Sequence, residues 1–177
     1  NSVERFINTS LLQYPRFESY QKEFSLKNFY KAVDYKGGFT MMGAKLAGTG
    51  TREEPAILTF FRNDTLRVKS TSLLYIFYPG RVVSSDASIT IYLDKDSIHH
   101  AALQFLYRVP NRELSLLKSE RYTARSPYLN SYHQIDMNFD QLRWRIDEPL
   151  IYFTYAPGAA GCVAIFESFN YFKQQDF

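Results

Sequence analysis

The stretch Ala87-Ser88-Ile89-Thr90-Ile91-Tyr92-Leu93-Asp94 decides the fold class of this chain. Its apolar residues Ala87, Ile89, Ile91 and Leu93 alternate with residues that tolerate water. Successive side chains of a β-strand point to opposite faces, so these four side chains would share one face. The pattern therefore predicts a strand with one buried and one wet face, which is typical of antiparallel sheets.

The same texture continues on both sides of this stretch. Apolar residues recur at every second position or in short runs, and turn-forming residues separate the runs. The turn signals are Arg62-Asn63-Asp64, Tyr78-Pro79-Gly80 and Pro110-Asn111-Arg112. The further strands that the pattern predicts span 40–48, 56–61, 66–70, 73–78, 103–109 and 114–117.

The apolar phase changes in the last third of the chain. Ile135, Met137 and Phe139 alternate with polar residues on one parity, whereas Leu142 and Trp144 continue on the other. A one-residue slip moves every side chain to the opposite face, so a loop, bulge or short helical turn must follow Phe139. Two last strands are predicted at 150–155 and 162–166, on either side of a turn at 157–161.

Length and composition agree with a β fold. The chain has 177 residues, and single domains usually span roughly 100–200 residues. Aromatic residues make up 17% of the chain, and the 14 Tyr and 15 Phe among them favour strands. We therefore predict one mainly β domain over residues 1–177, folded as an antiparallel sandwich or jelly roll. A short β-solenoid is the alternative, and at most one or two short helices are expected.

The beginning of the chain has a different pattern. Val3, Phe6, Ile7 and Leu11 have helix-like spacing before Pro15 interrupts them. Residues 1–16 are therefore expected to form a helical or irregular lead-in to the β domain.

Charge and apolar content narrow the range of partners. The formal net charge is +3, and the densest basic stretch is interrupted by Glu113 and Glu120. Nucleic-acid binding, which needs a clustered basic face, is not predicted. The sequence holds no run of about 18 apolar residues, so no membrane-spanning helix is predicted. The single Cys162 cannot form an intrachain disulfide. The basic residues of the stretch that Glu113 and Glu120 interrupt are Arg108, Arg112, Lys118, Arg121 and Arg125.

The three histidines lie in two polar segments, Asp96 to His100 and Ser131 to Asp136. A metal site could combine His99 or His100 with His133 and a carboxylate of Asp96 or Asp136, because imidazole and carboxylate suit zinc or iron. Adjacent residues of a strand point to opposite faces, so at most one of His99 and His100 could take part. The alternative is two polar turns in which Asp and Ser side chains cap backbone amides.

Hydrolytic chemistry has weaker support. Ser97 or Ser131 could serve as a nucleophile beside these histidines, but the Gly-x-Ser-x-Gly motif is absent from the sequence. Carboxylate pairs for glycoside hydrolysis could form at Asp94 with Asp96, or at Asp136 with Asp140. Carboxylates near strand ends more often form turns. Glycines between residues 37 and 50 lack the Gly-Lys-Ser/Thr ending of a phosphate loop and instead indicate close turns.

Aromatic clusters at 60–61, 75–78 and 152–155 allow two interpretations. They could form a stacking platform for sugars or bases, but aromatics at this density usually fill the core of a sheet. A platform would require several rings exposed together in a groove. We therefore predict no catalytic, cofactor-binding or metal-binding residues, and no cofactor, and the chain is not expected to be an enzyme.

The chain contains the phrases Tyr14 to Tyr20, Gly37 to Met41, Asp96 to His100, Ser126 to His133 and Phe166 to Phe172. These phrases resemble segments of very large, uncharacterised proteins of Gram-negative bacteria. The resemblance implies an internal β module of an exported protein of the periplasm or cell envelope. The texture of short strands ending in Gly or Ser is also similar to the β-jellyroll modules of the lipopolysaccharide-transport (organic-solvent-tolerance) family.

The expected function follows from these observations. The leading hypothesis is a non-catalytic structural or interaction module of a larger exported bacterial protein, with neighbouring modules or other envelope proteins as partners. The second hypothesis is a glycan- or lipid-binding β module that uses an aromatic face. The third hypothesis is a metal-dependent enzyme that uses His99 or His100 with His133, which requires those residues to come together.

Overall fold

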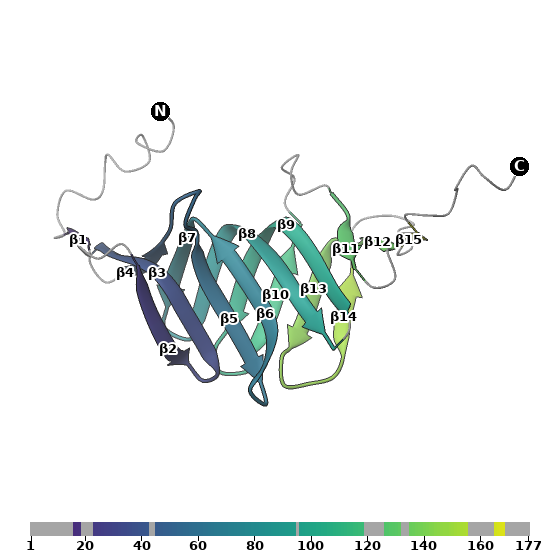
Figure 1. Cartoon of the computed structure of the whole chain (residues 1–177), viewed down its shortest axis with the longest axis horizontal. Helices are drawn as coiled ribbons and strands as arrows, with labels where there is room; N and C mark the ends of the chain where they lie inside the picture. The colour runs from purple at the N-terminus through teal and green to yellow at the C-terminus, as the bar shows by residue number, and fades with distance from the viewer. Residues whose placement is uncertain are drawn as a thin grey trace, which may run out of the picture.

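The computed structural model consists of antiparallel β-strands in two layers (Figure 1). It describes residues 16–18, 23–42, 45–94, 96–118, 126–131, 135–155 and 165–168. The strands are β1 (Arg16–Glu18), β2 (Phe24–Tyr30), β3 (Val33–Met42), β4 (Lys45–Thr49), β5 (Ala56–Arg62), β6 (Thr65–Ser72), β7 (Leu74–Tyr78), β8 (Arg81–Leu93), β9 (Asp96–Arg108), β10 (Glu113–Leu117), β11 (Tyr128–Asn130), β12 (Ile135–Asn138), β13 (Gln141–Arg145), β14 (Ile151–Thr154) and β15 (Ile165–Ser168).

Three long strands, β3, β8 and β9, belong to both layers. The start of β8 pairs with β7 at Val82 and Val83, whereas its end pairs with β6 at Ile89 and Ile91. β3 likewise pairs first with β5 and then with β4, and β9 pairs first with β11 and then with β10. The sheet is therefore folded over on itself along these three strands, which makes an antiparallel sandwich.

The three long strands divide the sheet into a first and a second layer. The first layer holds β5, β6, the start of β3, the end of β8 and the start of β9. The second layer holds β4, β7, the start of β8, the end of β9, and then β10, β13 and β14. β8 and β9 bend together, and the register between them shifts twice between Ser84 and Ile89. Such β-bulges sharpen the local bend of a strand.

Aromatic side chains join the two layers in the core. Phe60 of β5 meets Tyr107 of β9 edge to face with ring centroids 4.8 Å apart, and Tyr35 of β3 meets Phe77 of β7 at 5.4 Å. All four rings are buried. The excess of Tyr and Phe in the sequence therefore serves mainly to fill the sandwich.

The end of the sandwich opposite the bend is closed by arginines from its turns. Arg112, which is buried, donates from Nη1 to the carbonyl of Lys31, from Nη2 to that of Phe61 at 2.6 Å, and from Nε to Asp147 at 3.1 Å. Arg62 donates to the carbonyl of Glu148 at 3.0 Å. Because Lys31 and Phe61 adjoin the first layer and Asp147 follows β13, these bonds tie the two layers together.

The predicted fold class is confirmed, and the alternation from Ala87 to Leu93 is the second half of β8. Ala87, Ile89 and Ile91 are buried, and Ser88 and Thr90 are partly exposed on the other face. The predicted turns at 62–64, 78–80 and 110–112 all occur, and so does the break after Phe139. All pairings in the described residues are antiparallel, unlike the stacked parallel coils expected of a β-solenoid. Residues 1–15 of the lead-in predicted at 1–16, and positions 162–164 of a predicted strand, lie outside the described residues, while Arg16 begins β1.

Two local predictions were wrong. The single strand predicted at 40–48 is two strands, β3 and β4, which pair with each other at Met42 and Lys45. Gly43 was the available turn signal there, and one glycine does not separate a turn from a strand interior. The polar turn considered at 96–100 is the beginning of β9, because pairing with β8 and β11 outweighs the weak strand preference of Asp96 and Ser97.

Candidate functional site

The outer face of the second layer carries an ordered array of polar side chains. Cross-strand register places Arg108, Glu113 and Arg145 directly opposite one another on β9, β10 and β13. Alternate residues of the same strands, such as Leu114 and Leu142, are buried in the core. The strand period of two therefore holds the polar array outside the sandwich. The next row toward the bend is formed by Leu106, Ser115, Arg143 and Tyr152 of β14.

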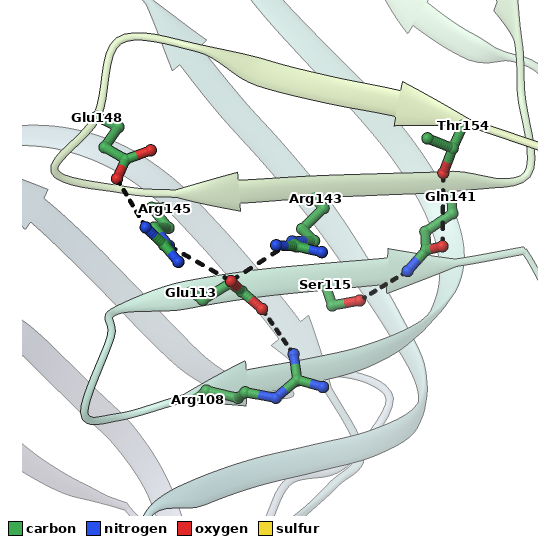
Figure 2. Close-up of polar contacts among 8 residues, drawn as sticks. All are labelled: Arg108, Glu113, Ser115, Gln141, Arg143, Arg145, Glu148 and Thr154. Carbon is green, nitrogen blue, oxygen red and sulfur yellow. Dashed lines mark hydrogen bonds and ion pairs between the residues drawn. The ribbon is translucent and has the colours of Figure 1, made fainter.

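Glu113 is the centre of the array (Figure 2). Its side chain is only 8% exposed, and Arg108 Nη1 lies 2.7 Å from its Oε1. Arg143 Nε lies 3.4 Å and Arg145 Nε 3.6 Å from its Oε2. The three arginine side chains cover the carboxylate and are themselves about half exposed. One carboxylate is thus shared by three guanidinium groups.

The arginines differ in how fully their donors are used. Arg145 also binds Glu148 at 3.1 Å, and this hydrogen bond raises the pKa of Arg145. Arg143 approaches Glu113 most closely through Nε, and its two terminal nitrogens donate no hydrogen bond in the part of the chain that the structure describes. A guanidinium presents its donors as a flat fork that matches the two oxygens of a carboxylate. Three arginines and two glutamates leave one positive charge in the array.

A hollow of about 440 Å³ opens beside Arg143, and we call it the Arg143 hollow. Along one side, Gln141 donates to Ser115 Oγ at 3.2 Å and accepts from Thr154 Oγ1 at 3.5 Å (Figure 2). The hollow is lined by Gln141, Arg143, Arg145, Glu148, Tyr152 and Thr154.

A second, more apolar hollow of about 570 Å³ adjoins it and shares Gln141. Its lining includes Ile76 and Val83, which lie directly opposite each other on β7 and β8, and Leu106 follows them on β9. Leu117, directly opposite Gln141 on β10, is 36% exposed. The outer face of the second layer therefore combines an apolar band with an adjoining polar, arginine-bearing region.

The structure places the two described histidines in separate environments. His99 is hydrogen-bonded to Thr90 Oγ1 through Nδ1 at 3.0 Å, on the outer face of β9. His100 is buried, receives the backbone N–H of Ala102 at Nδ1, and donates from Nε2 to the carbonyl of Ser126. Both ring nitrogens of His100 thus serve backbone groups, which leaves no lone pair for a metal. The described residues hold no group of three potential metal ligands, and His133 lies outside them.

The two polar segments around these histidines do come together. β11 pairs with β9, and Ser97 Oγ and Ser131 Oγ lie 2.9 Å apart. Asp96 accepts from Asn130 Nδ2 at 2.6 Å and from the backbone N–H of Ser97. These contacts form a cap on the β9–β11 pairing. The predicted capping role of the Asp and Ser side chains is thereby confirmed.

The remaining candidates serve packing or surface ion pairs. Asp94 binds Arg67 at 3.1 Å and is largely exposed. A Cβ on Gly48 would lie 2.6 Å from Tyr35 Oη, so this glycine allows a strand to approach the core closely. Tyr75 and Phe77 are buried, whereas Tyr152 is 52% exposed. The described hollows contain no group of three exposed rings, so the alternative of an aromatic platform does not occur among them.

Sequence reasoning missed Glu113, Arg143 and Arg145 as members of one cluster. Arg143 and Arg145 alternate with Leu142 and Trp144, so their shared outer face could have been read from the strand period. Their meeting with Glu113, about 30 positions earlier in the chain, depends on the register of β10 against β13. Nothing in the local sequence encodes that register.

Fold and surface together define an antiparallel β sandwich with an arginine-bearing outer face. Comparison of the chain with protein-family models, curated proteins and solved structures finds no match. In the described residues, no helix has the length and apolar character needed to cross a membrane. Function is therefore inferred from the contacts described above.

Proposed function

We propose that this chain is a non-catalytic interaction module, and that it binds its partner through the outer face of the second layer. The observation that carries the proposal is the array around Glu113. Three half-exposed arginines meet one buried carboxylate, and the terminal fork of Arg143 donates no hydrogen bond among the described residues. Arginine is enriched in protein interfaces because its planar fork binds strongly and specifically.

The apolar band beside the array supports the same proposal. Ile76, Val83 and Leu106 supply apolar contact area, and the arginines flank it. Binding surfaces commonly combine a central apolar area with a polar rim that fixes orientation.

The cellular context of the module is also a proposal. Its support is the resemblance to internal segments of very large exported proteins of Gram-negative bacteria, carried by phrases such as Gly37 to Met41. The partners would then be neighbouring modules of the parent chain or other proteins of the cell envelope. In this role the module would contribute recognition and not chemistry.

Site-specific photo-crosslinking in the producing cell tests the binding face. A benzoylphenylalanine replaces Leu117, in the apolar hollow, and a control replaces the exposed Lys69 on the outer face of β6 in the first layer. We expect a discrete adduct from position 117 that is absent from position 69 and disappears in the Arg143→Glu variant. Equal adducts from both positions, or none from position 117, would overturn the proposal.

A further inference from the structure

The Arg143 hollow offers an incomplete set of partners for a small anionic ligand. Arg143 lies closest to Glu113 through Nε, at 3.4 Å, and its terminal fork donates no hydrogen bond among the described residues, so the fork is available to a second carboxylate. A carboxylate bound by such a fork forms two parallel charge-assisted hydrogen bonds. The hollow, at about 440 Å³, falls within the range of roughly 300–1,000 Å³ that small-molecule sites occupy.

The other groups in the hollow suit a sugar ring. Tyr152 stands directly opposite Arg143 on the neighbouring strand and is 52% exposed. An exposed aromatic ring can pack against the C–H face of a sugar. Gln141 and Thr154 offer an amide and a hydroxyl, and Glu148 offers an acceptor oxygen, for sugar hydroxyl groups.

The charge of the site favours a carboxylate over a phosphate. Glu113 and Glu148 lie among the three arginines, so the array carries one net positive charge. A singly charged anion neutralises that excess, whereas a phosphate monoester with a charge of about −1.5 to −2 would meet repulsion from the two glutamates.

We infer that the Arg143 hollow binds a hexuronate residue, the carboxylate-bearing sugar of an acidic glycan. The inference rests on the proposed function, since it uses the same outer face, and it adds the chemical class of the ligand. The sugar carboxylate would bind the fork of Arg143, the ring would pack on Tyr152, and its hydroxyls would meet Gln141, Thr154 and Glu148.

Calorimetric titration of the full chain tests the inference. The probes are oligosaccharides of galacturonate, glucuronate and mannuronate, the same chains with their carboxyl groups reduced to alcohols, and polyglutamate of equal charge. We expect at least one uronate series to bind at least tenfold more tightly than its reduced form and than polyglutamate. That preference would require both the carboxylate and the sugar.

Matched variants locate the binding. Arg143→Gln should weaken uronate binding roughly 10- to 100-fold, and Arg143→Lys should not restore it, because a lysine has no fork. Tyr152→Ala should weaken it roughly 2- to 10-fold. Arg81→Gln is the control for uronate binding. Arg81 stacks over Tyr78 in the adjoining apolar hollow and does not line the Arg143 hollow, so its loss should change uronate affinity less than about twofold. Thermal melting of each variant checks that it is folded.

The outcomes separate this inference from the proposed function. If no uronate binds, or Arg81→Gln and Arg143→Gln weaken binding equally, the inference is overturned while a positive crosslink from position 117 still supports an interaction module. If polyglutamate binds as well as the uronates and depends on Arg143, the face recognises acidic protein segments, and the sugar inference is again overturned.

Discussion

The buried tyrosines of this sandwich form two groups, those whose hydroxyl is hydrogen-bonded and those whose hydroxyl has no hydrogen-bond partner among the described residues. Tyr75 Oη lies 2.6 Å from Ser70 Oγ, and Tyr35 donates to the carbonyl of Gly38 at 2.6 Å. The hydroxyls of Tyr107 and Tyr128 are buried and have no hydrogen-bond partner in the described part of the chain. A buried hydroxyl that lacks a partner has lost its hydration without compensation.

Replacing these tyrosines by phenylalanine should therefore have opposite effects. We expect Tyr75→Phe to lower the free energy of unfolding by roughly 0.5–1.5 kcal/mol, because Ser70 then loses its partner. Tyr128→Phe should leave the free energy unchanged or raise it. Urea unfolding of both variants beside the parent chain measures the difference. Equal losses in the two variants would show that the Tyr128 hydroxyl does have a stabilising partner.

At the scale of elements, buried serines support the bend of β8. Ser72 Oγ donates to the carbonyl of Asp86 at 2.7 Å and accepts the backbone N–H of Leu74 at 3.1 Å. Ser84 Oγ lies 2.9 Å from Ser72 Oγ and accepts the N–H of Asp86. These bonds satisfy backbone groups at the point where β6 ends, β7 begins and β8 passes between the layers.

Loss of one of these hydroxyls should weaken the bend. We expect Ser72→Ala to lower the free energy of unfolding by about 1–3 kcal/mol, because the N–H of Leu74 is left without a partner. Ser88→Ala, on the outer face of β8, is the control and should change the free energy of unfolding by less than about 0.5 kcal/mol. Denaturant unfolding compares the two. A cost for Ser88→Ala as large as that for Ser72→Ala would contradict this account of the bend.

Alternation predicted most of the individual strands but not their assembly. The period-two pattern of Ala87 to Leu93 identified the second half of β8, since one face of that strand is buried. It did not show that β8 continues back to Arg81 in the other layer, because the bulge at Ser84 changes the phase. Alternation equally did not predict the array around Glu113. Its members lie on β9, β10 and β13, and they meet only through long-range register.

At the scale of the whole molecule, the buried tyrosines make stability depend on alkaline pH. Burial raises the pKa of Tyr107 from 10.0 to about 12, and it also raises the pKa values of four further tyrosines. An unfolded tyrosine loses its proton near pH 10, while the folded chain keeps it. The unfolded state then binds fewer protons, so stability falls as pH rises. The affected residues are Tyr30, Tyr35, Tyr75, Tyr107 and Tyr128.

We therefore expect the tyrosine contribution to be fully present below pH 10 and to be lost progressively as pH rises through about 12, the folded pKa of Tyr107. Urea unfolding at a series of pH values gives the free energy, and tyrosinate absorbance reports the ionisation. The buried rings should ionise together with unfolding. Full ionisation of all tyrosines near pH 10 in a chain that remains folded would contradict this expectation.

The fold-over of the sheet and the arginine hydrogen bonds at the opposite end also determine where the native state opens partially. At the bend, β3, β8 and β9 run continuously from one layer to the other, so the layers can separate there only if these strands break. At the other end, Arg112 and Arg62 hold the layers together through side-chain bonds alone. Amide hydrogens beside Phe61 and Ile146 should therefore exchange through partial opening, and faster in Arg112→Lys, whereas those at the bend should exchange only when the whole chain unfolds. The two layers are thus joined covalently at one end, through three continuous strands, and non-covalently at the other, through Arg112 and Arg62.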